Sequence, residues 1–139
     1  MPRLIAALLR HGDYRQLPDT PSALQPFPLT DEGRQQARDA ACALMKMALD
    51  MGCRIDSELH SSRLLRGWET ASILGEALKG DFAIQDFDAL AERSVGSAAN
   101  LTVSQIEAVV REDPRFEELP PDWKSSSHFC LPLQGAESL

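Results

Sequence analysis

The stretch Leu4-Ile5-Ala6-Ala7-Leu8-Leu9-Arg10-His11-Gly12 carries the strongest indication of the fold. It opens with a short, continuously apolar run, which is typical of a strand buried on both faces in a parallel sheet. The polar residues that follow stand where this strand would end, and ligands of open α/β sheets bind beyond the carboxyl ends of the strands. The stretch therefore predicts a buried strand over residues 4–9, with His11 at the mouth of a binding site.

Three later segments have the marks of helices. Thr30, followed by Asp31 and Glu32, predicts a helix start, because a threonine side chain caps free amides and acidic residues favour the positive end of a helix. Thr102 and Gln105 form a capping-box pattern that begins another helix. Between these two, apolar residues at helical spacing predict a helix with a buried face made of Leu64, Trp68, Ala71 and Leu78.

Segments 55–60 and 82–87 are predicted strands, and 135–139 has the pattern of a further helix start. Strands and helices therefore alternate, which favours an α/β fold: a three-layer sandwich around a mainly parallel sheet. With 139 residues the chain is long enough for one domain and too short for two, so we expect a single domain over 1–139.

Composition and charge narrow the classes of function. The chain has 43% hydrophobic and 25% charged residues, as globular proteins do, and no stretch long enough to span a membrane. The net charge of -7 disfavours a nucleic-acid partner and means that any phosphate site must be locally basic. The N-terminal apolar run lacks a signal-peptide cleavage site, so we expect the cytoplasm. Three cysteines share no metal-ligand spacing, so we expect reduced thiols and no metal.

Three positions carry residues suited to phosphate chemistry, and each alone has an ordinary alternative. His11 at a strand end suits a ligand, although a lone histidine there is more often structural. Arg66 begins the helix after the second predicted strand, where it forms an anion site with the helix amides or lies on a solvated helix face. Glu92 lies on a loop after the third predicted strand, where a single glutamate is usually a surface residue.

Five ordered motifs together resemble the histidine phosphatase superfamily, whose fold is phosphoglycerate-mutase-like. The motifs are Arg10-His11-Gly12, Leu29-Thr30-x-x-Gly33-x-x-Gln36-Ala37, Ser61-Ser62-x-Leu64-x-Arg66-x-x-Glu69-Thr70-Ala71, Leu90-x-Glu92 with Gly96, and Gly135-Ala136-Glu137-Ser138. They span essentially the whole chain. The resemblance is specific because the motifs occur in the family's order.

The resemblance implies a role for four residues. His11 is the nucleophile that forms a phosphohistidine, Arg10 and Arg66 hold the phosphoryl oxygens, and Glu92 gives a proton to the leaving group. Each role fits its residue type: a neutral imidazole is a good nucleophile, guanidinium groups stabilise charge on a phosphoryl group in transfer, and an alkoxide needs a proton. The family needs no metal and no cofactor.

The chain departs from the family pattern close to the nucleophile. Many relatives have an asparagine six residues after it, where this chain has Leu17. Arg15 is a candidate substrate-binding residue instead, or an ordinary loop residue. Tyr14 stands where phytase-type relatives have an arginine, which disfavours a phytase.

A second catalytic histidine of the family follows the Gly-Glu-Ser motif, and neither His60 nor His128 matches it, because both precede Gly135. We therefore expect residues 1–139 to be the N-terminal major part of a domain that is incomplete at its carboxyl end. The family places the missing strand near the strand that leads to His11, so an uncovered apolar edge, low activity and self-association, for example a homodimer, are expected.

The function that this resemblance implies is a phosphatase acting on phosphomonoesters, either small molecules or phosphoproteins, through a phosphohistidine intermediate. Two alternatives stay open. One is a phosphoglycerate-type mutase, although no residues are visible that would recognise a carboxylate or keep water out. The other is a catalytically incompetent module that binds phosphate or a protein partner. The sequence does not name the substrate.

Overall fold

A computed structural model describes residues 3–21, 24–116 and 118–138. The chain divides into two compact units, one formed by Met1–Arg15 with Phe27–Leu90 and one formed by Gln16–Pro26 with Ala91–Leu139. We describe each unit by itself. Within the described ranges, no helix combines the length and the apolar character that a bilayer crossing requires.

Helix α1 of the first unit spans Asp31–Asp50, as its start signal predicts. The Thr30 side chain caps it by accepting a hydrogen bond from the Gly33 amide at 3.0 Å. Its buried face contains Gly33, Ala37 and Ala41, so the helix turns its smallest residues inward. Such small residues allow the backbone of α1 to approach its neighbours closely.

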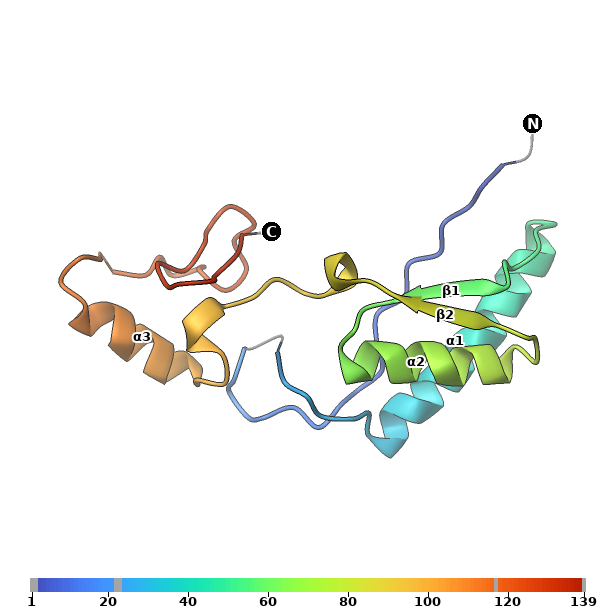
Figure 1. Cartoon of the computed structure of the whole chain (residues 1–139), viewed down its shortest axis with the longest axis horizontal. Helices are drawn as coiled ribbons and strands as arrows, with labels where there is room; N and C mark the ends of the chain where they lie inside the picture. Colours follow the sequence, from blue (N-terminus) through green and yellow to red (C-terminus); the bar gives the residue numbers. More distant parts are fainter. Residues whose placement is uncertain (1–2, 22–23, 117, 139) are drawn as a thin grey trace. The chain divides into compact units, whose positions relative to one another are not determined.

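The sheet of the first unit consists of strands β1 (Glu58–Ser61) and β2 (Ala83–Asp86). They pair in parallel, with Glu58 opposite Ala83 and Ser61 opposite Asp86. Helix α2 (Leu65–Ala77) connects them and packs against both strands and α1, as Figure 1 shows in green and cyan. This arrangement confirms a mixed α/β fold with a parallel sheet and with the site motif at the carboxyl end of β1.

The predicted strand over 4–9 is wrong in this structure. The segment is irregular, and the Leu4 and Leu8 side chains are 95% and 96% exposed. A strand buried on both faces needs a paired neighbour and a covering layer on each side. The described part of the chain supplies neither to this segment, so its apolar character alone does not make it a strand.

The predicted buried face of α2 is only partly correct, since Leu64, Ala71 and Leu78 are half-buried. Trp68, which was expected inside, is 46% exposed. The residues that α2 buries are Arg66, Thr70, Leu74 and Gly75. Two of these four residues are polar, so a prediction from apolar residues alone misplaces the buried face of the helix.

The second unit is built around helix α3 (Val103–Glu112). Both hydrogen bonds of the predicted capping box are present, between Thr102 and Gln105. The buried core consists of Ala98, Ile106, Trp123 and Leu131. Beyond the helix end, the Arg115 guanidinium donates to the Asp113 carboxylate and lowers its pKa to about 2.

The helix start predicted at 135–139 does not form over 135–138, and Leu139 lies outside the described residues. Gly135 has a φ of 78°, a left-handed value that does not start an α-helix. Ala136 instead forms an antiparallel bridge with Val95. This segment therefore packs against the loop that follows Glu92.

Candidate active site

The His11 ring makes one hydrogen bond through each nitrogen. Arg66 Nε donates to His11 Nε2 at 3.2 Å, and His11 Nδ1 lies 2.8 Å from the Gly12 carbonyl oxygen. A guanidinium N–H can only donate, so Nε2 must accept, and Nδ1 must then carry the proton and donate to Gly12. The geometry therefore selects a neutral imidazole with its lone pair on Nε2.

Arg66 brings a positive charge into the interior of the first unit. It is the second residue of α2, its side chain is among the largest fully buried ones, and its Cζ lies 4.5 Å from the centroid of the Tyr14 ring. The same ring meets His11 edge-on at 5.4 Å. No side chain among the described residues caps the start of α2, whose amides add positive potential. The site is thus locally basic in an acidic chain.

The loop that carries His11 is attached to the first turn of α1. Asp13 accepts hydrogen bonds from the Thr30 amide at 3.0 Å through its carbonyl and from the Thr30 hydroxyl at 2.7 Å through its carboxylate. A Cβ atom on Gly12 would lie 2.3 Å from the Gly33 carbonyl oxygen, closer than real Cβ atoms approach. The two backbones touch directly, so glycine is required at this position.

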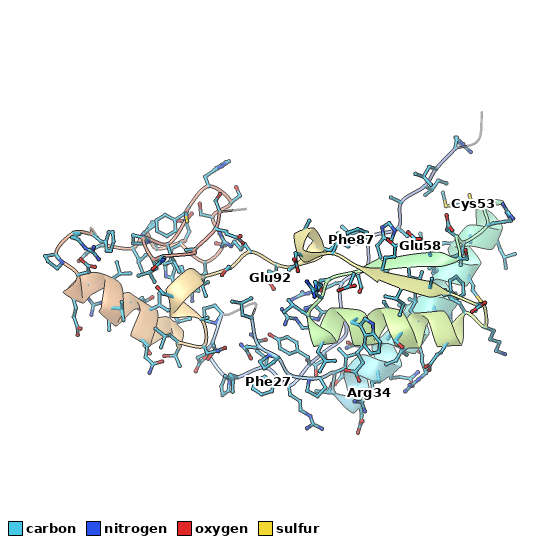
Figure 2. The ribbon with its side chains drawn as sticks, in the orientation of Figure 1. Phe27, Arg34, Cys53, Glu58, Phe87 and Glu92 are labelled. Atoms are coloured by element: carbon cyan, nitrogen blue, oxygen red, sulfur yellow. The ribbon has the colours of Figure 1, made fainter. Side chains whose placement is uncertain are left out.

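Glu69 has a structural role that the sequence analysis missed. One carboxylate oxygen accepts from the Leu29 amide at 2.9 Å, and the other pairs at 2.8 Å with Arg34, which is labelled in Figure 2. Glu69 therefore ties α2 to the beginning of α1, beside the His11 loop. The sequence indicated the importance of Glu69 only through its place in the Glu-Thr-Ala motif, because the residues around it do not identify Arg34 or Leu29 as its partner.

Arg10 and Arg15 stand on either side of the His11 loop, and both are exposed. Arg15 forms a backbone hydrogen bond to Pro28 at 3.1 Å. Among the residues that the structure describes, none pairs with either guanidinium group. Their predicted contacts to a phosphoryl group or substrate stay predictions.

Glu92 belongs to the second unit, on an exposed segment labelled in Figure 2. The residue after it, Arg93, donates to the carbonyl oxygens of Lys124, Ser126 and Phe129 at 2.6, 3.1 and 3.2 Å. Glu137 accepts from the Ser94 amide at 2.9 Å and donates its own amide to the Ser94 carbonyl at the same distance. These bonds hold the backbone around Glu92, whose predicted meeting with His11 stays a prediction.

Mycobacterial hydrolases are among the solved structures that are similar to this chain. Native mycobacterial glucosyl-3-phosphoglycerate phosphatase is 27% identical with a TM-score of 0.64, over 92% of this chain and 53% of that one. Its complex with inorganic phosphate is 30% identical with a TM-score of 0.54, over 73% and 42%. A structure named mycobacterial hydrolase 2 is 26% identical with a TM-score of 0.61, over 92% and 48%. The chain thus spans about half the length of these structures.

No curated protein sequence matches the chain significantly. The model of the histidine phosphatase superfamily, branch 1, matches residues 6–129, nearly the whole chain. This match includes the His11 loop, α1, α2 and Glu92. The chain therefore belongs to the histidine phosphatase superfamily, branch 1.

Proposed function

We propose that this chain carries the phosphoryl-accepting part of a phosphatase that hydrolyses phosphomonoesters through a phosphohistidine on His11. The observation that supports this most is the pair of bonds on the His11 ring, to Gly12 at 2.8 Å and from Arg66 at 3.2 Å. They give Nε2 the lone pair and place a cation beside it. A nucleophile and an oxyanion partner are therefore adjacent before any substrate binds.

The reaction has two steps. A phosphoryl oxygen replaces Nε2 of His11 as the acceptor of the Arg66 hydrogen bond. Nε2 then attacks phosphorus, and the bond from phosphorus to the ester oxygen breaks. Glu92 in its acid form gives a proton to the departing alkoxide, while Arg10 and Arg66 hold the remaining oxygens. Water then attacks phosphorus of the phosphohistidine and gives its proton to the Glu92 carboxylate, which restores the acid form of Glu92. The P–N bond breaks, its electron pair returns to Nε2, and inorganic phosphate leaves.

The substrate class is a phosphomonoester, either a small molecule or a phosphoprotein. One solved relative, described above in its native form and with inorganic phosphate, is named as a phosphatase of glucosyl-3-phosphoglycerate, which supports hydrolysis of an ester phosphate. Glucosyl-3-phosphoglycerate therefore belongs in the first panel of substrates, with aryl phosphates and phosphopeptides beside it. Arg15 is the proposed residue for contact with the organic part.

The decisive experiment is chemical identification of the phosphoenzyme. Incubation of the chain with a labelled aryl phosphate is expected to give a base-stable, acid-labile label that maps to His11. His11→Ala should remove the label. His128→Ala is the matched control, because His128 is exposed in the second unit and should leave labelling unchanged. Acid-stable labelling, or a label that survives His11→Ala, would overturn the proposal.

A further inference from the structure

Thr70 makes two hydrogen bonds within the site, although the chemistry above gives it no task. Its hydroxyl donates to the Arg66 carbonyl oxygen at 2.7 Å, and the Gly12 amide donates to the same hydroxyl oxygen at 3.1 Å. Combined with the two bonds on the His11 ring, these form a closed cycle. The cycle runs from the Arg66 carbonyl through Thr70, Gly12 and His11, and returns to the Arg66 side chain.

The direction of every bond in this cycle is fixed by chemistry. A threonine hydroxyl has one proton, and here the Arg66 carbonyl accepts it, so a lone pair of the oxygen faces the Gly12 amide. Gly12, held through its N–H, presents its carbonyl oxygen in the next peptide group to Nδ1 of His11. The guanidinium of Arg66 can only donate to Nε2. Reversing any one bond would place two donors or two acceptors against each other.

Burial makes the two hydrogen bonds of Thr70 hard for water to open, whereas the two bonds on the His11 ring are partly buried. Thr70 and Arg66 are 7% and 2% exposed, and Gly12 is buried. Buried polar groups that lose a partner have no solvent to replace it. The contact of Gly12 with Gly33 also prevents the loop from moving toward α1 to relax.

We propose that Thr70 is a positioning residue that fixes the tautomer of His11 and the direction of its Nε2 lone pair relative to Arg66. A threonine hydroxyl bonded to the carbonyl four residues earlier is common in helices. That habit does not account for the second bond, which reaches Gly12, 58 residues away in sequence. The catalytic consequence rests on the proposed phosphohistidine reaction, whereas the tautomer does not.

The first test is nitrogen NMR of the histidine rings in the chain itself, at a pH well above the ordinary histidine pKa of about 6.5. Wild-type His11 is expected in the Nδ1–H form. Thr70→Val, which keeps the shape and removes the hydroxyl, should shift His11 toward the Nε2–H form that free imidazole side chains prefer. Thr70→Ser should restore the wild-type spectrum. Thr102→Val is the control, because it removes the cap of α3 in the other unit and should leave His11 unchanged.

The second test is the rate of phosphoenzyme formation from an aryl phosphate. Thr70→Val should slow it about tenfold or more, because misplacement of a reacting atom is costly, and Thr70→Ser should not. Equal His11 spectra in wild type and Thr70→Val would overturn the inference. If Thr70→Val does not fold, the wild-type spectrum alone decides: His11 in the Nε2–H form would also overturn the inference. Absent phosphoenzyme with the expected spectra would count against the proposed function alone.

Discussion

The two loops that carry the predicted reactive residues are held in different ways. The His11 loop is fixed by buried contacts to two helices, through Thr70 of α2 and through the touching backbones of Gly12 and Gly33. The loop after Glu92 is fixed by bonds that lie nearer the surface, chiefly from Glu137 and Arg93. The proposed nucleophile, His11, therefore stands in a packed setting, whereas the proposed acid, Glu92, stands on an exposed segment held by backbone contacts. Substitutions around the His11 loop should therefore change the stability of the fold, whereas substitutions around the Glu92 loop should change the reaction rate or local exchange.

The largest expected effect concerns Glu92 itself. In a chain that turns over substrate, Glu92→Gln should slow hydrolysis of alkyl phosphates by about a hundredfold to ten-thousandfold, because a poor leaving group depends on the proton it receives. Aryl phosphates with good leaving groups should lose far less. The measurement is kcat/KM against the pKa of the leaving group, with Glu112→Gln at the exposed end of α3 as control. Equal losses on both substrate classes would remove Glu92 from this role.

Packing of the His11 loop is tested by Gly12→Ala. The added methyl group would meet the Gly33 carbonyl, so the free energy of unfolding should fall by roughly 3 kcal/mol, the upper end of ordinary overpacking. Gly75→Ala is the matched control, because its new Cβ would have only ordinary contacts at 3.4 Å with Leu59 and Phe82. Chemical denaturation measures both. A Gly12→Ala chain as stable as Gly75→Ala would show that the two backbones do not touch.

The connection between the helices is tested by Glu69→Gln. Loss of the charge weakens the bonds to Arg34 and Leu29, and we expect a cost of about 1.5–3 kcal/mol in the free energy of unfolding, as for hydrogen bonds to charged groups. Asp31→Asn removes the charge of the other carboxylate near Arg34. The Asp31 side chain is fully exposed and its Oδ1 lies 3.6 Å from the Arg34 guanidinium, so the change should cost far less than that of Glu69. Similar costs for the two variants would contradict a structural role for Glu69.

The smallest effect is expected in the second loop. Glu137→Ala removes the acceptor of the Ser94 amide, so exchange of that amide with deuterium should become faster while global stability changes by less than about 0.5 kcal/mol. Glu118→Ala, another exposed position of the same unit, should leave the exchange of Ser94 unchanged. Unchanged exchange in Glu137→Ala would mean that the carboxylate does not hold this loop.

Local signals in the sequence predicted the parts whose energetics are local. The caps at Thr30 and Thr102 fixed where α1 and α3 begin, because a cap depends on residues within one turn. The run over 4–9 could not be assigned in this way, since pairing of a strand depends on neighbours that its own residues do not specify. The apolar residues of this run are exposed in the structure, so their apolar character did not predict their burial.

The site shows a second limit of pattern reading. Family motifs indicated that His11 and Arg66 belong together, and the structure places them 3.2 Å apart. The buried face of α2 was mispredicted because Arg66 and Thr70 occupy it, and polar residues are ordinarily counted as outward-facing. At a functional site, hydrogen bonds satisfy such residues inside the protein. The two residues that misled the helix prediction, Arg66 and Thr70, are also the ones that contact the His11 loop.

The bond from Arg66 to Nε2 of His11 also limits which reagents can attack the histidine. The Arg66 guanidinium donates its proton to the lone pair of Nε2 that an electrophile would need. In the proposed reaction a phosphate ester removes this obstruction itself, because its oxygens accept the hydrogen bonds of the guanidinium in place of Nε2. A neutral acylating reagent such as diethylpyrocarbonate has no such means. His11 should thus be modified more slowly than the exposed His60 and His128, so that the hydrogen bond from Arg66 would act as a source of chemical selectivity.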